Sequence, residues 1–556
     1  MLRSLYFSGV LIAASSGLAG CSSEPALPSV AADKLGKVDF TVSCDVAVRA
    51  DFNHAVALLH HMTYAQARTS FEQIAVKDPR CAMAQWGIAM TLFQPLWPTR
   101  PSAADLQLGW RSAQKGLALD PPTAREKAYV RAVAAFYQDP EATDYWQRIN
   151  RWETMSKSVH ESFPEDVDAS AFYALALLAS ARPGPSLQQH SQQAIALLLP
   201  IHASNPEHPG AMHYIIHAND IPGREHENLD VVRRYEEIAP DNAHAIHMPT
   251  HIYTRLGDWD GVIRGNLRAA TVALRDPAGT HGEFVSDEFA HAIEYLVYAY
   301  LQQGADTQAA AQIARLLAIP NLEPTAKTAF HVASTRARYA LERHAWSEAA
   351  ALVPRDPPVV DWDRFPWPES VTWFARGYGA ERSGNLAECK HAIARLHELQ
   401  LRAEKSGETV FARQIQMLEL ELAGFNTHAA HDDATAISLL RQAIDIEGAT
   451  PKPAVTPAAT LPASELLGDL LLELSRPAEA LTAYEQSLQR FPRRFNSTLG
   501  VVRARLATGD AVGAEETYCE LLRLGASGSR VKSLDDVPAL MRQALHRAPA
   551  CAVHRD

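Results

Sequence analysis

Apolar and small residues recur along this chain at the spacing of amphipathic helices. Near the C-terminal end, Gly468 lies between Leu467 and Leu471, and Ala480 and Tyr484 follow at the positions expected of a second helix. Small residues at such positions allow paired helices to touch. No stretch alternates with a period of two, so strands are expected to be few. The pattern predicts an all-α fold built from antiparallel helix pairs.

These helix pairs repeat along the sequence. Ala480 recurs as Ala514, 34 residues later. Tyr484 recurs as Tyr518 with the same offset. The period and the residue types resemble tetratricopeptide (TPR) repeats, which implies a right-handed TPR-like α-solenoid of stacked helix pairs. No copy matches the consensus throughout, and the unit spanning 257–304 is longer, so the repeats are irregular.

Shifts in composition predict how the chain is organised. The expected segments are a lipoprotein signal peptide at 1–20, a tether at 21–45, an N-terminal TPR-like block at 46–350 that holds the histidines of interest, a Pro/Trp-rich connection at 351–369, a second TPR-like block at 370–446, a Pro/Ala/Thr-rich linker or long loop at 447–462, a C-terminal TPR pair at 463–525 and a tail at 526–556.

Composition and charge narrow the function. Hydrophobic residues make up 47% of the chain and charged residues 21%, which suits a globular chain with a large core. The formal net charge of −12 argues against nucleic acid as a partner. The sequence has no HExxH motif, no Gly-rich phosphate loop and no GxSxG nucleophile motif. Any catalysis would therefore depend on a bound metal.

The N-terminal segment carries an export signal. Arg3 precedes an apolar run over 5–17 that is too short to span a membrane, and the segment ends in LAGC at Cys21. LAGC resembles the lipobox of bacterial lipoproteins, in which the cysteine is acylated and becomes the new N-terminus. Ser22 follows it, which in that family favours the outer membrane. We therefore expect a lipid anchor at Cys21 and an outer-membrane protein facing the periplasm. A cleaved signal with a chance LAGC is the alternative.

Export also bears on the remaining cysteines. Cys44 and Cys81 flank the first helix pair, and an oxidising periplasm permits one disulfide between them, with free thiols as the alternative. Cys389 and Cys519 fall at packing positions inside helical repeats, where buried thiols are expected. Cys551 lies in the tail and is assigned no role.

Two histidine pairs occupy the same place in neighbouring repeats. His213 and His217 lie four residues apart, as do His247 and His251, and the second pair follows the first by 34 residues. Residues four apart share one face of a helix. The repeat then places the second pair beside the first. Converging imidazoles are the donors by which proteins hold transition metals, so the four histidines predict a metal site facing the groove.

Further donors fall in phase with these pairs. His244 shares a helix face with His247, and the first helix of the next unit carries His291 and Glu294. Asp220 and Tyr298 are expected behind the ligands, where Asp220 would orient an imidazole. The ligand candidates exceed the needs of one ion, so the number of ions stays open: they are His213, His217, His244, His247, His251, His291 and Glu294.

The segments HPGAMHYIIHAND and HAIHMPTHIYTRLGDWD also resemble an uncharacterised group of bacterial TPR proteins with the same two histidine-rich segments. The resemblance covers about 46–300 and implies the fold without naming a reaction. Three functions stand: a zinc or copper protein of the cell envelope, a scaffold whose groove binds peptide or protein partners, or a metal-dependent hydrolase or oxidoreductase. Pro249, between His247 and His251, raises the question of whether that helix kinks.

Overall fold

The computed structural model describes residues 34–551 except 98–99, 140, 142–143, 276, 280–281, 526–527, 531–533, 535 and 548. The expected signal peptide, the expected lipid anchor at Cys21 and the expected tether up to residue 33 lie outside the described residues. None of the described helices is long and apolar enough to cross a membrane.

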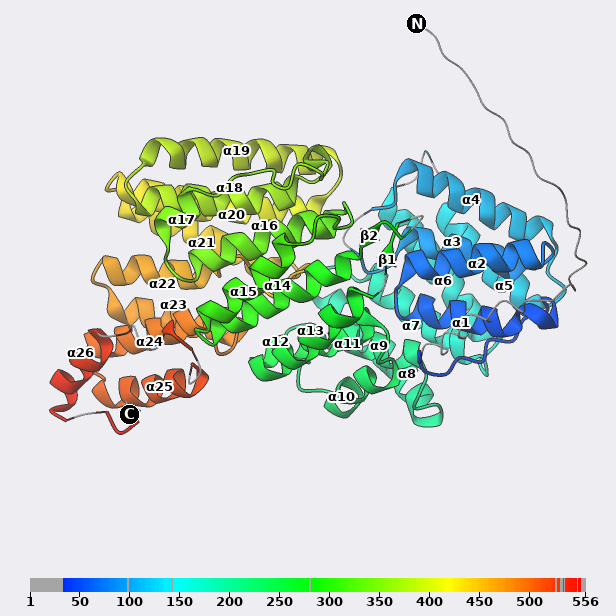
Figure 1. The fold of residues 1–556 in the computed structure, drawn as a ribbon, viewed down its shortest axis with the longest axis horizontal. Helices are drawn as coiled ribbons and strands as arrows, with labels where there is room; N and C mark the ends of the chain where they lie inside the picture. Colours follow the sequence, from blue (N-terminus) through cyan, green and yellow to red (C-terminus); the bar gives the residue numbers. More distant parts are fainter. Residues whose placement is uncertain are drawn as a thin grey trace, which may run out of the picture. The chain divides into compact units, whose positions relative to one another are not determined.

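The N-terminal part is a run of helices that pack in sequence order (Figure 1). Its elements are η1 (Val46–Val48), α1 (Arg49–His60), α2 (Tyr64–Lys77), α3 (Ala82–Phe93), α4 (Ala103–Ala118), α5 (Ala124–Tyr137), α6 (Tyr145–Ser162), α7 (Val167–Ser180) and α8 (Pro185–Ser204).

The central part carries the histidine-rich segments. Its elements are α9 (Pro209–Asn219), α10 (Leu229–Ile238), α11 (Ala243–His247), α12 (Pro249–Leu256), α13 (Trp259–Ala273), β1 (Pro277–Ala278), β2 (Phe284–Val285), α14 (Asp287–Gln302), α15 (Asp306–Leu317), α16 (Ala326–Leu341) and α17 (Trp346–Ala350). The two short strands pair antiparallel, with Pro277 opposite Val285.

The C-terminal part returns to long helix pairs. Its elements are η2 (Trp362–Arg364), α18 (Pro366–Arg382), α19 (Leu386–Lys405), α20 (Thr409–Ala429), α21 (Asp433–Ala449), α22 (Ala463–Glu473), α23 (Pro477–Arg490), α24 (Phe495–Thr508), α25 (Ala511–Leu524) and α26 (Asp536–Leu545). The last of these lies within the tail segment.

Small residues allow the helices of a pair to approach closely, as the sequence pattern predicts. A Cβ atom added to Gly468 or Gly500 would lie 2.7 or 2.4 Å from the ring of Tyr484, which packs between α22 and α24. First helices of successive pairs also pack together, as α14 does on α16, α16 on α18 and α18 on α20. The prediction of an all-α, TPR-like solenoid with irregular repeats is confirmed.

The Pro/Ala/Thr-rich segment between α21 and α22 is packed into the fold. Residues 455–461 are mostly buried. Arg338 on α16 donates hydrogen bonds to the carbonyl oxygens of Ala458 and Ala459 and to Thr456 Oγ1. Because its carbonyl groups are bound by a buried guanidinium, this segment forms a fixed wall of the interior.

One disulfide lies near each end of the described chain. Cys44 and Cys81 are joined, which the sequence allowed. Cys519 and Cys551 are also joined. This corrects the expectation of a buried thiol at Cys519 and of no role for Cys551, because α26 brings the tail back against α25. Cys389 is a free, buried cysteine, as expected.

Candidate metal centre

Helix α9 places His213 and His217 on one face. Pro209 occupies its first turn, where no backbone donor is needed, and the side chain of His208 accepts from the backbone N–H of Ala211. The helix is almost entirely buried, and the ring centroids of His213 and His217 lie 4.8 Å apart. The spacing of four residues therefore brings the two rings together, as the sequence predicts.

Pro249 interrupts the next histidine-bearing helix. Helix α11 ends at His247 and α12 begins at Pro249, because proline has no N–H to continue the ladder of hydrogen bonds. Pro249 therefore breaks the helix between His247 and His251. His247 and His251 still meet across it, with 2.9 Å between their Nε2 atoms.

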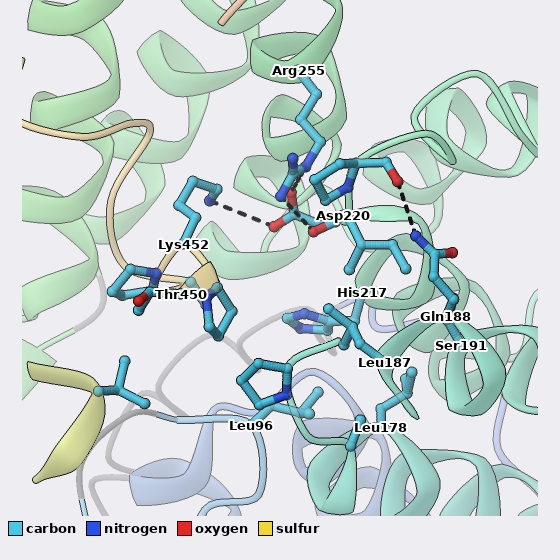
Figure 2. A pocket seen from close by; sticks show the side chains of 18 of the residues that line it. Leu96, Leu178, Leu187, Gln188, Ser191, His217, Asp220, Arg255, Thr450 and Lys452 are labelled. Carbon is cyan, nitrogen blue, oxygen red and sulfur yellow. Dashed lines mark hydrogen bonds and ion pairs between the residues drawn. The ribbon is translucent and has the colours of Figure 1, made fainter. Parts of the chain in front are cut away.

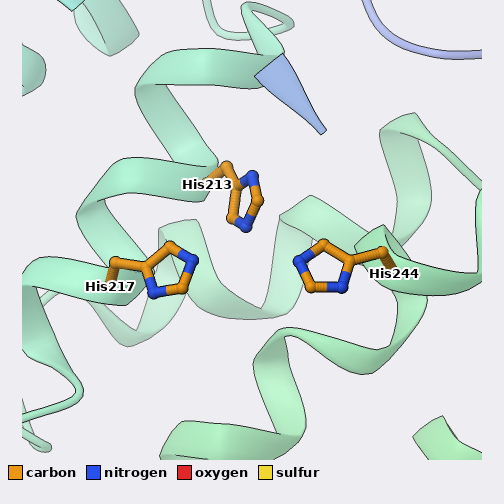
Figure 3. Close-up of side chains that lie close together, drawn as sticks. All are labelled: His213, His217 and His244. Carbon is orange, nitrogen blue, oxygen red and sulfur yellow. The ribbon is translucent and has the colours of Figure 1, made fainter. Parts of the chain in front are cut away.

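The histidines assemble into two groups of three. The first triad is His213, His217 and His244, in which one ring nitrogen of each lies within 4.8 Å of the other two. Figure 3 shows these rings facing one another across a common space. His244 therefore joins the pair on α9, although the sequence places it beside His247 on the same helix face.

The first triad has ring nitrogens that no hydrogen bond uses. His213 Nδ1 donates to the carbonyl oxygen of His60 at 2.7 Å, and His244 Nδ1 lies 3.4 Å from the carboxylate of Glu288. With Nδ1 as the protonated nitrogen, Nε2 carries the lone pair in both rings. The Nε2 atoms of His213, His217 and His244 are all buried without a hydrogen-bond partner. Such orphaned groups are rare in proteins and require an explanation.

Burial keeps the rings of His213 and His217 neutral. It lowers the pKa of His213 well below its ordinary value and that of His217 to about 3, and neighbouring histidines lower both further. A neutral imidazole is the form that binds a metal. His213 and His217 are thus unprotonated at neutral pH.

The second triad is His247, His251 and His291, again with ligand atoms within 4.8 Å of one another. Asn266 Oδ1 accepts from His247 Nδ1 at 2.6 Å, and Asp220 accepts from His251 Nδ1 at 3.0 Å. The Asn266 amide is oriented by its donation to Val262 O. The two Nε2 lone pairs therefore face each other at 2.9 Å.

A proton is a poor bridge between these two lone pairs. Burial lowers the pKa of His247 well below its usual value, and the pKa of His251 is also lowered by burial despite its bond to Asp220. Histidine ligands typically donate their second nitrogen to a carboxylate or amide oxygen, as both rings do here. A divalent cation would satisfy both lone pairs.

Two of the expected residues have other partners. Glu294 accepts from His331 Nδ1 and Ser334 Oγ, both at 2.6 Å, and belongs to a third group with His291 and His331. Tyr298 corrects the expectation that it supports the ligands: its hydroxyl accepts from Arg494 at 3.3 Å, because it lies one turn too far along α14.

Sequence reasoning missed several residues that surround the triads. Tyr295 lies one turn beyond His291 on α14, and its hydroxyl is 3.5 Å from His251 Nε2. His331 sits on α16, the next first helix, and its Nε2 is buried and unpartnered. Continuing the repeat by one more unit would have found His331. Asn266 and Glu288 carry no comparable sequence signal.

Another histidine group in the same interior is fully satisfied. We call it the closed network: His60, Asp168 and His208. Asp168 Oδ1 accepts from His60 Nε2 at 2.8 Å and from His208 Nε2 at 3.3 Å. His60 Nδ1 bonds the hydroxyl of Tyr214, and His208 Nδ1 accepts a backbone N–H. Every ring nitrogen of this network has a partner, so the network holds α1, α7 and α9 together.

Every member of the triads except the half-buried His217 is buried, whereas the sequence predicted that they face the groove. His213 is 0% and His244 3% exposed. The loop that follows α3 and the segment before α22 cover them, since Leu96, Trp97 and Ala454 share a small cavity with histidines of both triads. The covering residues are far from the histidines in sequence, which is why the pattern of one repeat did not reveal them.

A larger cavity of about 450 Å³ adjoins the first triad (Figure 2). His217 lies on its wall, beside Asp220. Asp220 binds Arg255 Nε at 2.5 Å and lies 3.6 Å from Lys452 Nζ. The candidate centre therefore has a space next to it that is large enough for a small molecule.

Comparisons with known proteins add little to this geometry. No protein-family model and no curated protein matches the chain. Among solved structures, the human IFIT1 dimer with m7Gppp-AAAA matches at a TM-score of 0.39 and 12% identity, covering 87% of this chain and 96% of that one. The APC/C hetero-tetramer Cut9-Hcn1 matches at 0.27 and 14% identity, covering 90% and 96%. Scores this low carry no argument about the ligands of this chain.

Proposed function

We propose that this chain is a TPR-like metal-binding protein of the bacterial cell envelope, which holds zinc or copper in its histidine triads. The observation that carries the proposal is the set of three buried, unpartnered Nε2 atoms of the first triad. Three imidazole ligands suit either metal and leave a fourth coordination position open.

The second triad supports a second ion. Its His247 and His251 nitrogens are close enough to share one cation, and their other nitrogens are held by Asn266 and Asp220. Two metal equivalents per chain are therefore expected, one for each triad.

A peptide-binding scaffold is the alternative that the sequence left open. A peptide groove would spread its polar contacts along an exposed surface, whereas these histidines converge in the interior. This observation favours metal over peptide as the ligand of the histidines. A scaffold role would have to use another surface of the solenoid.

A metal-dependent hydrolase or oxidoreductase is a second candidate function. His217 belongs to the first triad and also lines the 450 Å³ cavity, so a molecule in the cavity would lie beside the bound ion. Storage or delivery of the metal needs no such cavity. The loaded protein should therefore be screened against ester, phosphoester and phenolic substrates.

The envelope location rests on the lipobox-like LAGC at Cys21. Replacing Cys21 by serine should abolish incorporation of labelled palmitate and move the protein from the membrane pellet to the soluble fraction. Palmitate incorporation that persists in Cys21→Ser would refute the lipid anchor.

Elemental analysis of the full-length protein, purified without a His-tag, tests the metal proposal. We expect about two equivalents of zinc or copper for the wild type, about one for His217→Ala and about one for His251→Ala. His226→Ala, which removes an exposed histidine outside both triads, is the matched control and should keep both ions.

Helicity and thermal melting of each variant separate loss of metal from loss of fold. A wild type that stays free of metal after incubation with zinc and with copper would overturn the proposal. Equal metal loss in His226→Ala would show that binding is adventitious. Substitution with cobalt adds an independent readout, because a tetrahedral site gives intense visible absorption that His217→Ala should lose.

A further inference from the structure

The 450 Å³ cavity is positively charged, although the chain as a whole carries −12. Its lining includes four cationic side chains and a single carboxylate, that of Asp220. The cations are Arg100, Arg255, Lys452 and Arg490. Arg255 and Lys452 share Asp220 between them, as Figure 2 shows, so this part of the wall keeps an excess positive charge.

Carboxyl groups lie near the other two cations, Glu408 near Arg100 and Glu447 near Arg490, but not within ion-pair distance. Among the described residues, no carboxylate forms an ion pair with Arg100 or Arg490. The guanidinium of Arg100 lies 3.7 Å from the centre of the Tyr145 ring, and Arg490 donates to the backbone carbonyl oxygens of Glu447 and Thr450. Burying a cation without a counter-ion costs free energy.

Burial shifts the pKa values of three of these cations. It lowers the pKa of Arg100, of Arg490 and of Lys452 from their ordinary values. A bound anion would offset this cost, because an opposite charge at close range stabilises each cation.

The rest of the wall is apolar and partly aromatic. Trp97, Tyr145 and Trp146 line it together with Leu178 and Leu187. Flat and aliphatic side chains of this kind bury the apolar body of a ligand, while a few charged groups fix its orientation. An inorganic anion would leave this apolar surface unused.

We propose that this cavity binds a small organic carboxylate with an apolar or aromatic body, whose charged group is held by the cationic side chains of the wall, Arg100 and Lys452 among them. The site goes beyond the proposed metal function and does not depend on it, since the cations and the apolar wall are present without an ion. Because His217 lies on the same wall, a carboxylate bound here lies beside the first triad.

The test uses para-fluorobenzoate as the probe and fluorine NMR as the readout, on full-length protein stripped of metal with a chelator. The neutral analogue para-fluorobenzamide has the same ring and nearly the same size. We expect saturable binding of one benzoate per chain and at least about tenfold weaker binding of the amide, the effect of losing one charge-assisted contact.

Matched variants locate the binding site. Arg100→Gln and Lys452→Gln should each weaken benzoate binding by about tenfold. Arg182→Gln is the control, because Arg182 also stacks on Trp146, at 3.8 Å, but does not line the cavity. The affinity of this variant for the benzoate should stay unchanged. Thermal melting checks each fold. If Lys452→Gln is unstable, Arg100→Gln alone decides.

Three results would overturn the proposal: no saturable binding of the benzoate, equal binding of the amide, or unchanged affinity in Arg100→Gln. None of them bears on the metal proposal, since the titration uses metal-free protein. Conversely, a chain that binds the benzoate but no metal would keep the carboxylate site and lose the metal centre.

Discussion

The closed network and the first triad are two histidine groups in one interior with opposite hydrogen-bond states. In the closed network, Asp168 accepts from both imidazoles, and the second nitrogens of His60 and His208 also have partners. In the first triad, every Nε2 is buried and unpartnered. The two groups even touch, because His213 donates to the carbonyl oxygen of His60.

The difference shows that proximity of histidines does not by itself indicate a metal site. Both groups bring their ligand atoms within 4.8 Å of one another. Only the first triad has lone pairs that the protein leaves unused. The hydrogen bonds of each ring nitrogen therefore separate histidines that stabilise the fold from histidines that are free to bind a cation.

The largest effect is expected from His217→Ala at the first triad. Loss of one of three ligands should lower zinc affinity there by more than about 100-fold, exceeding the loss typical of outer partners. The metal-free variant should melt close to the wild type, because the lost nitrogen has no hydrogen bond to lose. Zinc titration and thermal melting measure the two quantities. A large loss of metal-free stability would place His217 with the structural histidines.

Asp168→Ala tests the other side of the comparison. Burial would raise the pKa of Asp168, but hydrogen bonds from His208 and His60 outweigh it and hold the carboxylate ionised. Its removal leaves two buried imidazole donors without an acceptor. The free energy of unfolding should fall by about 3 kcal/mol, as for other broken buried pairs.

Denaturant unfolding measures the loss in Asp168→Ala. The folded fraction should retain zinc at the first triad, since none of its ligands changes. Asp168→Asn keeps one acceptor oxygen and should lie between the wild type and Asp168→Ala. An Asp168→Ala variant that is as stable as the wild type would contradict the structural role of the closed network.

The repeat pattern predicted the fold and named all six histidines of the two triads as candidates, because a period of 34 residues fixes which helix faces recur. It did not predict how they are grouped. His244 joins His213 and His217, whereas His247, three residues further along α11, joins His251 and His291. The acceptor of His213 belongs to His60, 153 residues away, and such a long-range contact has no local sequence signal.

The residues that cover the triads could not be predicted from the sequence either. The segment at 447–462 has the composition of a linker, yet Ala454 lines the small cavity beside the triads. What fixes this segment is Arg338, a residue on a distant helix whose guanidinium binds the carbonyl oxygens of Ala458 and Ala459. Composition predicts the absence of a helix there, but the burial depends on tertiary contacts.

The buried carboxyl groups of Glu447 and Glu421 also have unpartnered atoms, but here a proton rather than a metal can satisfy them. Burial raises the pKa of Glu447 to about 7 and that of Glu421 well above its usual value, and both have oxygens without partners. The unfolded carboxyl ionises near 4.5. The stabilising protonated form is therefore present at low pH and lost as the pH rises toward 7.

Glu447→Gln should remove this dependence. Relative to the wild type, the variant should gain about 1.4 kcal/mol of stability for each pH unit between about 5 and 7. Chemical denaturation at several pH values gives the difference, and Glu516→Gln, at an exposed glutamate, should show no such trend. A constant difference between Glu447→Gln and the wild type across this range would contradict the raised pKa.

The smallest effect is expected from Asp220→Asn, which should affect metal binding at the second triad and leave the first triad unchanged. Asp220 accepts from His251 Nδ1, so its carboxylate orients a ligand of the second triad only. Its replacement should weaken metal binding at the second triad by about 10–100-fold, the usual cost of losing an outer partner. The first triad serves as the internal control, because His213 and His244 take their Nδ1 partners from His60 and Glu288. A two-site zinc titration resolves the outcomes: selective weakening of one site supports two independent centres, whereas equal weakening of both would mean that the histidines act as one.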